Sequence, residues 1–237
     1  MKGEGLQKLK ESEKAEVVSY FNGTGFERWN RIYSDSENVN KVQRNIRIGH
    51  QKTVDDVLLW LKEAGGIEDT TFCDAGCGVG SLSLPLVALG AKSVASSDIS
   101  SAMVEETKRR AELDGLDLNR MSFNISDLES LKGSFNTVIC LDVFIHYPQK
   151  AAEEMVLHLC DLTENRLIVS FAPYTPFLAL LKSIGQFFPG PSKTTRAYIL
   201  KEKGIVDAAI KCGFKVKQRK LNQAPFYFSQ LIEFEKV

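Results

Sequence analysis

The stretch Asp74-Ala75-Gly76-Cys77-Gly78-Val79-Gly80 decides the fold, because it joins the short apolar run Thr70-Thr71-Phe72-Cys73 to a helical pattern from Ser81 to Leu89. This order predicts a strand, a glycine-rich turn and a helix. Glycines at alternate positions let the backbone approach a ligand closely, and the N-terminus of the following helix offers unpaired N–H groups. The sequence therefore predicts a small, nucleotide-like ligand at this turn.

The glycine spacing indicates what kind of ligand this is. The turn reads G-x-G-x-G with Asp74 directly before it, whereas the dinucleotide fingerprint reads G-x-G-x-x-G and binds a pyrophosphate. A carboxylate at this place favours a cation and repels phosphate. S-adenosylmethionine carries an α-ammonium and a sulfonium and has no phosphate, so we expect it as the cofactor. The pattern resembles motif I of the class I methyltransferases.

Two further acids follow predicted strands. Asp98 closes the segment from Ser93 to Asp98, roughly 20 residues on, where an acid accepts hydrogen bonds from ribose hydroxyls. Asp127 follows the segment from Met121 to Ile125, where this fold commonly offers a side chain to the adenine amino group. N-capping of a helix explains either acid equally well in isolation, but their order favours a cofactor site. The predicted cofactor-binding residues are His50, Asp74, Gly76, Gly78, Gly80, Asp98, Ile99, Asp127, Leu128 and Leu141.

Composition limits the class of protein. With 237 residues and 43% apolar content, the chain is long enough for one principal α/β domain with a small extension. Lys plus Arg equals Asp plus Glu at 30 each, so no overall charge favours nucleic acid. The five scattered cysteines indicate a reducing compartment, and we predict no metal bound by the protein. We find no apolar signal core and no run long enough to span a membrane.

The order of segments predicts the fold class. Strand-like and helix-like segments alternate after the glycine turn, which is typical of an α/β fold with a parallel sheet and crossover helices. Two last strand-like segments, Phe214 to Leu221 and Phe226 to Phe234, are joined by Asn222-Gln223-Ala224-Pro225 and predict an antiparallel pair. Resemblance to the class I methyltransferases implies a Rossmann-like, mostly parallel seven-stranded sheet with an antiparallel last strand.

Two parts of the chain lie outside the predicted sheet. Residues 1–65 contain apolar helical patterns and are predicted to form an N-terminal helical arm or lid, with the methyltransferase domain at 66–237. Residues 172–201, rich in Phe, Leu, Pro and Gly, are predicted to form a cap insertion after the fifth strand. Both would wall a pocket, although ordinary core packing is the commoner role for any single aromatic residue.

Longer phrases in these parts carry a closer resemblance. Aromatic and cationic residues are mixed in the segments from Arg28 to Tyr33 and from Phe187 to Tyr198, a combination that suits an amphipathic carboxylate. The most specific phrases are Tyr20-Phe21-Asn22, His146-Tyr147-Pro148 and Phe188-Pro189-Gly190-Pro191-Ser192-Lys193. From about Val18 to Glu233 the chain resembles the magnesium-protoporphyrin IX O-methyltransferase family of chlorophyll biosynthesis.

The resemblance implies methyl transfer from S-adenosylmethionine to one propionate of magnesium-protoporphyrin IX, giving the monomethyl ester and S-adenosylhomocysteine, with magnesium present only in the substrate. A propionate titrates near the ~4.3 of a Glu side chain, so it is ionised at neutral pH and needs no general base. The enzyme must instead desolvate and align it. Tyr33 and His146 are the predicted catalytic residues. Trp29, Lys193 and Arg196 are the predicted substrate-binding residues, with a cation on the other propionate.

Several alternatives remain at this point. His146 could ligate the porphyrin magnesium, although this hard cation prefers oxygen. His50 could meet the methionyl carboxylate, while His158 is interpreted as a surface or packing residue. The acceptor could be a quinone precursor or another small aromatic acid. A nicotinamide dehydrogenase is disfavoured by Asp74, and a non-catalytic protein that docks to the magnesium chelatase is a third alternative.

The resemblance also bears on location. It implies a plastid (chloroplast) stroma, with or without membrane association, or the cytoplasm of a cyanobacterium. The apolar segment from Phe177 to Phe188 could make peripheral membrane contact or line the pocket, and the sequence favours neither.

Overall fold

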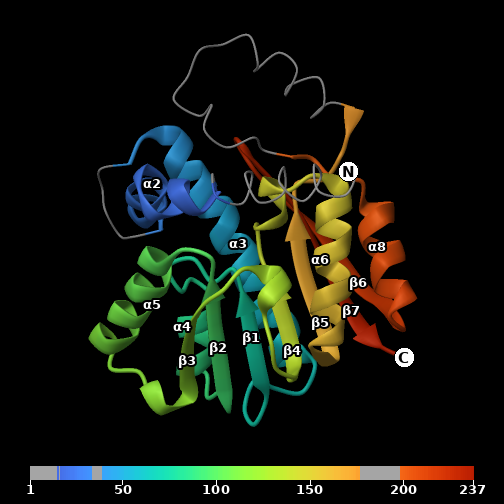
Figure 1. Ribbon diagram of the computed structural model, residues 1–237, viewed down its shortest axis with the longest axis horizontal. Coiled ribbons are helices and arrows are strands. Elements are labelled where there is room, and N and C mark those ends of the chain that lie inside the picture. The colour runs from blue at the N-terminus through green and yellow to red at the C-terminus, as the bar shows by residue number, and fades with distance from the viewer. Residues whose placement is uncertain (1–14, 16, 34–38, 177–197) are drawn as a thin grey trace, which may run out of the picture.

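The computed structural model describes residues 15, 17–33, 39–176 and 198–237. A seven-stranded sheet forms its centre, in the order β3-β2-β1-β4-β5-β7-β6 (Figure 1). The strands are β1 (Thr71–Ala75), β2 (Ser93–Asp98), β3 (Met121–Ile125), β4 (Phe135–Cys140), β5 (Thr163–Phe171), β6 (Phe214–Ala224) and β7 (Tyr227–Lys236). Strand β7 pairs antiparallel with both β5 and β6, and the other pairs are parallel. The predicted sheet is confirmed.

The helices connect these strands. The α-helices are α2 (Thr24–Ile32), α3 (Lys41–Glu63), α4 (Ser83–Ala88), α5 (Ser101–Leu113), α6 (Gln149–Asp161) and α8 (Glu202–Lys211). The short 3-10 helices are η1 (Leu118–Arg120), η2 (Leu128–Ser130) and η3 (Phe144–His146). Among the described residues, no helix is both long enough and apolar enough to cross a bilayer.

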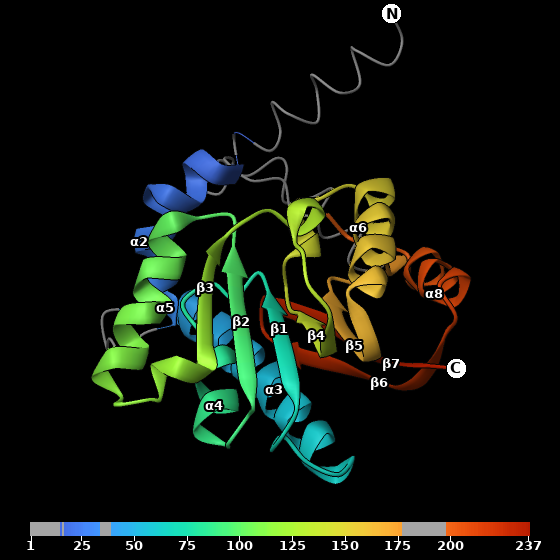
Figure 2. The ribbon, with the colours of Figure 1, turned by 60° about the horizontal axis from the view of Figure 1, so that its bottom comes forward.

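The core has two halves, one on each face of the sheet. On β4, Val138 and Cys140 face the cluster that contains α6 and α8, while Ile139 faces the cluster that contains α3 and α4. Side chains of a strand alternate between faces, so a strand buried on both faces reads as a continuous apolar run. Figure 2 shows the helices on both sides of the sheet. This three-layer arrangement brings the carboxyl ends of β1, β2 and β4 to one edge, where ligands of open α/β sheets bind.

Helix α3, which lies within the predicted N-terminal arm of residues 1–65, packs against the sheet. It begins with a capping box, in which Asn40 and Gln43 exchange hydrogen bonds of 2.9 and 3.1 Å. Its Val54, Val57 and Leu61 are fully or almost fully buried against the sheet. Residues 41–63 therefore belong to the core of the domain, because their apolar face is covered by the sheet. Residues 17–33, which include α2, lie beyond the carboxyl ends of the strands as an arm (Figure 1).

The hairpin between β6 and β7 is tighter than predicted. Pairing continues through Asn222 to the pair Ala224 and Tyr227, which leaves a turn of only Pro225 and Phe226. The polar sequence of this segment suggested a connection, but Asn222 is buried and donates a hydrogen bond of 3.2 Å to Thr53 of α3. This tertiary contact extends both strands.

Both described ends of the predicted cap insertion meet after β5. Pro173 and Leu200 form an isolated parallel bridge, and the Tyr198 N–H donates to the Ile145 carbonyl at 2.7 Å. Ala172 and Tyr198 lie in the wall of the main pocket. An insertion at this place therefore starts and ends beside the pocket, as expected from its position after the fifth strand, while residues 177–197 lie outside the described residues.

Candidate active site

A cavity of about 330 Å³ lies at the carboxyl ends of the central strands. Its wall contains three acids, Asp98, Asp127 and Asp142, and no Lys or Arg among the described residues. The remaining wall is mainly apolar and aromatic, with contributions from the arm, the glycine turn, η3 and the β6–β7 hairpin. The lining includes Val17, Phe21, Trp29, Tyr33, Ile46, His50, Ile99, Leu141, His146, Tyr198, Phe226 and Tyr227. Such a wall favours a cationic, partly apolar ligand.

The glycine turn forms one side of this cavity. Gly76 has φ of +89°, and a Cβ built on it would lie 2.2 Å from Cγ2 of Val143. Gly78 has φ of +52° and open space where a Cβ would point, so its backbone is free to meet a ligand. Gly76 and Gly78 line the pocket, whereas Gly80 does not. A Cβ on Gly80 would lie 2.9 Å from Thr107, so this third glycine serves the packing of α5.

Asp74 lies beneath the turn rather than in the pocket wall. It is 2% exposed, and its carboxylate accepts a hydrogen bond of 2.6 Å from the Ser83 hydroxyl, which itself accepts from Ser96 at 2.8 Å. Burial raises the pKa of Asp74 to about 6, although the hydrogen bond from Ser83 opposes the shift. The carboxylate of Asp74 can therefore act on a ligand only through its electrostatic potential, because it is not part of the cavity wall.

This burial gives a testable pH dependence of stability. The folded-state pKa of about 6 exceeds the ordinary 3.8, so the folded state is favoured when Asp74 is protonated, and stability is lost as pH rises from 3.8 through about 6. We expect Asp74→Asn to raise the free energy of unfolding near neutral pH by about 2–3 kcal/mol, with the difference disappearing near pH 4. Urea unfolding across pH measures this, with Asp207→Asn, at a partly exposed aspartate outside the cavity wall, as the control. A pH-independent difference would contradict the assignment.

Asp98 lies in the wall and supports the turn. Its carboxylate accepts the N–H of Gly78 at 3.0 Å and the N–H of Ser100 at 2.9 Å. Burial raises its pKa, and the backbone hydrogen bonds oppose the shift. Asp127 also lines the cavity and caps η2 through the N–H of Ser130 at 2.8 Å. Asp127 therefore both caps η2 and lies in the cavity wall.

The two predicted catalytic residues, Tyr33 and His146, both line the cavity. Burial lowers the pKa of His146 to about 4, although the charge of Asp142 opposes the shift. Burial and then the charge of Asp142 raise the pKa of Tyr33 well above its ordinary value. Both side chains are therefore uncharged at neutral pH. Among the described residues, His146 Nδ1 and Trp29 Nε1 are buried polar atoms without a hydrogen-bond partner.

Helix α5 and its N-cap residue, Ser100, hold the arm at the cavity. Arg110 of α5 donates to Oδ1 of Asn30 at 2.6 Å and to the Tyr33 carbonyl at 3.0 Å. The side chain of Asn22 accepts from the Ser100 hydroxyl at 2.8 Å. Trp29 stacks on Tyr33 with ring centroids 5.5 Å apart. These contacts explain how a segment that is remote in sequence brings Trp29 and Tyr33 into the wall.

The structure brings most of the predicted site residues together. Those that line the cavity are Trp29, Tyr33, His50, Gly76, Gly78, Asp98, Ile99, Asp127, Leu128, Leu141 and His146. Asp74 and Gly80 lie behind the turn, and Lys193 and Arg196 lie outside the described residues. His158 is away from the cavity and pairs with the Leu131 carbonyl at 3.0 Å. Among the described residues, no cluster of three His, Cys, Asp or Glu side chains could hold a metal ion.

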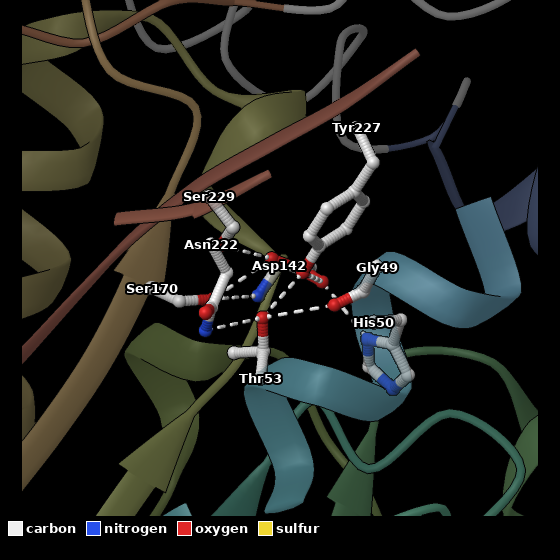
Figure 3. Close-up of polar contacts among 8 residues, drawn as sticks. All are labelled: Gly49, His50, Thr53, Asp142, Ser170, Asn222, Tyr227 and Ser229. Carbon is white, nitrogen blue, oxygen red and sulfur yellow. Dashed lines mark hydrogen bonds and ion pairs between the residues drawn. The ribbon is translucent and has the colours of Figure 1, made fainter. Parts of the chain in front are cut away.

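One central residue, Asp142, was missed by the sequence analysis. It lies two residues after the end of β4, has φ of +57° and lines the cavity. Figure 3 shows its carboxylate surrounded by side chains of three separate elements, namely α3, β5 and β7. Its partners are His50 Nδ1 at 2.9 Å, Tyr227 Oη at 2.7 Å, Ser170 Oγ at 2.8 Å and Ser229 Oγ at 2.9 Å. The only local signal was an acid at the end of a strand.

Helix α3 approaches this cluster closely. A Cβ on Gly49 would lie 2.3 Å from the Tyr227 ring, so only glycine permits this contact. Thr53, one turn later, lies 2.9 Å from the Tyr227 hydroxyl. The core position of α3 therefore places His50 beside Asp142.

Comparisons with known proteins agree with this geometry. A family model described as the magnesium-protoporphyrin IX methyltransferase C-terminus matches residues 140–236, and a methyltransferase domain model matches residues 72–165. The chain is 50% identical over 221 residues to magnesium protoporphyrin IX methyltransferase, chloroplastic, of Arabidopsis thaliana, covering 93% of this chain and 70% of the relative. It is 49% identical over 221 residues to magnesium-protoporphyrin O-methyltransferase of Synechocystis, covering 93% of this chain and 95% of the relative.

A solved structure shares the whole fold. The crystal structure of magnesium protoporphyrin IX methyltransferase from Synechocystis with bound S-adenosylhomocysteine has a TM-score of 0.87 and 47% identity, covering 94% of this chain and 100% of that chain. The similarity extends over nearly the whole of both chains. The chain therefore belongs to the magnesium-protoporphyrin IX methyltransferase family of S-adenosylmethionine-dependent methyltransferases.

Proposed function

We propose that the chain transfers the methyl group of S-adenosylmethionine to one propionate of magnesium-protoporphyrin IX and releases the monomethyl ester and S-adenosylhomocysteine. The observation that carries this proposal is the cavity wall, which combines three acids with uncharged donors and no Lys or Arg among the described residues. Three acids favour a cationic methyl donor. A wall without a described cation leaves the reacting carboxylate nucleophilic.

The proposed mechanism depends on positioning. S-adenosylmethionine supplies the methyl group when it is bound over Gly76, Gly78 and Asp98. Tyr33 donates from its hydroxyl to one oxygen of the propionate, because its raised pKa keeps the phenol protonated. His146, neutral because its pKa is lowered to about 4, hydrogen-bonds the same group through its unpartnered Nδ1. Neutral partners orient the carboxylate without the quenching that a bidentate arginine would cause.

The change in charge during the reaction also favours the products inside the cavity. Methyl transfer converts a carboxylate and a sulfonium into a neutral ester and a neutral thioether. Desolvation in the apolar cavity destabilises the charged reactants more than the neutral products, and it strengthens every electrostatic contact inside the cavity. No general base is required, because the propionate is already ionised. A hydroxyl of a quinone precursor would need a base, and His146, whose pKa burial lowers to about 4, is a weak one.

An assay with both acceptor classes tests the proposal. The purified chain is titrated with magnesium-protoporphyrin while the Soret band is followed, and monomethyl ester is sought after S-adenosylmethionine is added. We expect ester formation, with little competition from a dihydroxybenzoate. Methylation of the dihydroxybenzoate in preference to the porphyrin would favour the quinone-precursor alternative, and calorimetry with NADH against S-adenosylhomocysteine tests the dehydrogenase alternative.

Partners and location follow as parts of the same proposal. The relatives are a chloroplastic enzyme and a cyanobacterial one, so we place the chain in a plastid stroma or in the cytoplasm of a cyanobacterium. The chelatase that makes the substrate is the expected partner for direct transfer of a poorly soluble porphyrin. Peripheral membrane contact through residues 177–188 would serve the same purpose, and flotation with liposomes measures it.

A further inference from the structure

The carboxylate of Asp142 is fixed from all sides. Burial opposes its ionisation, but hydrogen bonds from His50, Tyr227 and Ser170 hold its pKa below the ordinary value. At neutral pH the group is therefore an anion that can only accept hydrogen bonds. Two donors meet each oxygen, with Ser170 and Ser229 at Oδ1 and His50 and Tyr227 at Oδ2.

The direction of every bond in the cluster follows from this anion. Because Asp142 accepts, the Tyr227 hydroxyl must donate to it, and the Tyr227 oxygen is then free to accept from Thr53 at 2.9 Å. The Thr53 oxygen in turn accepts the amide of Asn222 at 3.2 Å. Ser170 accepts the Asp142 N–H at 2.8 Å and donates back to Oδ1. Ser170, Ser229 and Tyr227 thus each direct a hydroxyl proton at Asp142 and hold its carboxylate in place. The Thr53 hydroxyl has two acceptors, the Tyr227 oxygen at 2.9 Å and the Gly49 carbonyl at 3.3 Å.

The same constraint applies to the His50 ring. Nδ1 lies 2.9 Å from Asp142 and must carry the proton that is donated. In its neutral form the imidazole has one N–H and one lone pair, and with the N–H at Nδ1 that lone pair lies at Nε2. Figure 3 shows the second ring nitrogen on the side away from Asp142. His50 lines the cavity beside Gly76 and Cys77 of the glycine turn, and its ring packs on Tyr33 with centroids 4.5 Å apart.

We infer that Asp142 is a positioning residue, which fixes His50 in the Nδ1–H tautomer so that Nε2 accepts a hydrogen bond from the α-ammonium of S-adenosylmethionine. The inference rests on the proposed function, because it assigns one end of the donor within the same cavity. It revises the expectation that His50 meets the methionyl carboxylate. A lone pair attracts an ammonium and repels a carboxylate, and the three acids of the wall act in the same direction.

The tautomer itself is the first measurement. The chain has three histidines, so imidazole nitrogen resonances of a ¹⁵N-labelled sample are few, and a His50→Gln variant assigns the relevant pair. At about pH 8 we expect His50 to show a protonated Nδ1 and an unprotonated Nε2. The contact between Nδ1 and Asp142 is by itself enough to give this signature, so the ligand contact below separates a positioning role from a merely structural one. Protonation of Nε2, alone or together with Nδ1, would overturn the inference.

The ligand contact is the second measurement. We compare two analogues of S-adenosylhomocysteine by calorimetry, one without the α-ammonium and one without the carboxylate. Because a hydrogen bond that involves a charged group contributes about 1.5–3 kcal/mol, loss of the ammonium should weaken binding by about 10- to 100-fold. Loss of the carboxylate should weaken binding less.

Variants of Asp142 connect the two measurements. Asp142→Leu removes the acceptor, so the His50 tautomer is no longer fixed and the preference between the analogues should largely disappear. Asp142→Asn keeps a carbonyl oxygen that can accept from Nδ1, and it should restore much of the preference. Ser229→Ala is the matched control, since it removes one donor at Oδ1 and leaves the contact with His50 intact.

The outcomes separate the two proposals. If S-adenosylhomocysteine fails to bind the unaltered chain, the proposed function and this inference both fall. If it binds but the analogue without the ammonium binds equally well, only the inference falls. If Asp142→Leu does not fold, the tautomer and the analogue preference of the unaltered chain still decide.

Discussion

We expect His146→Ala to lower kcat by about 100-fold while the affinity for S-adenosylmethionine stays within about two-fold of the unaltered chain. The physical reason is that His146 Nδ1 is a buried polar atom without a partner among the described residues, in a cavity that must orient a carboxylate. Such a group contributes when the carboxylate is aligned with the methyl group. Steady-state kinetics with magnesium-protoporphyrin and calorimetry with S-adenosylmethionine separate the two effects.

The protonation state of His146 adds a second observable. Its pKa is lowered to about 4 by burial, so its charge does not change near neutral pH. We therefore expect kcat to stay level between about pH 6 and 8. His158→Ala is the matched control, because His158 pairs with the Leu131 carbonyl away from the cavity. Equal losses of kcat and of donor affinity in His146→Ala would show that His146 belongs to the donor site.

The hydroxyl of Tyr33 should contribute less than the imidazole of His146. Tyr33→Phe leaves the stack with Trp29 and the contact with His50 in place and removes one neutral donor. A single neutral hydrogen bond is worth about 1 kcal/mol, so we expect kcat to fall by about five- to ten-fold. A comparable loss in the thermal stability of Tyr33→Phe would indicate a packing role.

Asp98→Ala should weaken binding of S-adenosylhomocysteine by about 100-fold or more, since a carboxylate that accepts from two ribose hydroxyls contributes about 1.5–3 kcal/mol per bond. Asp98 lies in the cavity wall and also accepts the N–H groups of Gly78 and Ser100. The variant therefore removes a ligand contact and loosens the turn.

An analogue of S-adenosylhomocysteine that lacks the ribose hydroxyls separates these two contributions. The analogue should bind the unaltered chain weakly, and Asp98→Ala should weaken its binding only slightly further. Asp127→Ala is the comparison variant, and we expect about a ten-fold loss, because a single contact to the adenine amino group is at stake. If the analogue and S-adenosylhomocysteine lose affinity equally in Asp98→Ala, the residue acts on the turn alone.

Much of this protein could be predicted from the sequence because the relevant signals are local. Strands β2 and β3 begin and end at the predicted residues, since short apolar runs between polar turns are encoded within a few positions. Gly76 and Gly78 have positive φ values, a backbone conformation that residues other than glycine rarely adopt, so the glycine pattern itself predicts the turn. The acids Asp98 and Asp127 follow strands whose carboxyl ends must meet at one edge of a parallel sheet. The family resemblance, which comparison confirmed, is also a property of the linear chain.

The tertiary structure decided the rest, because it depends on contacts between distant segments. Asp74 reads as a pocket acid, yet packing of α4 places Ser83 over its carboxylate and leaves it beneath the turn. Helix α3 reads as part of a lid, yet the sheet covers its apolar face.

Asp142 shows most clearly what the sequence alone could not predict. Its carboxylate is held by His50, 92 positions earlier, and by Tyr227, 85 positions later. No periodicity or spacing along the chain encodes such a meeting, whereas the packing of α3 and the last hairpin against β4 determines it. The kind of cofactor was thus set by local sequence, and the orientation of the groups that would hold it was set by long-range hydrogen bonds in the folded core.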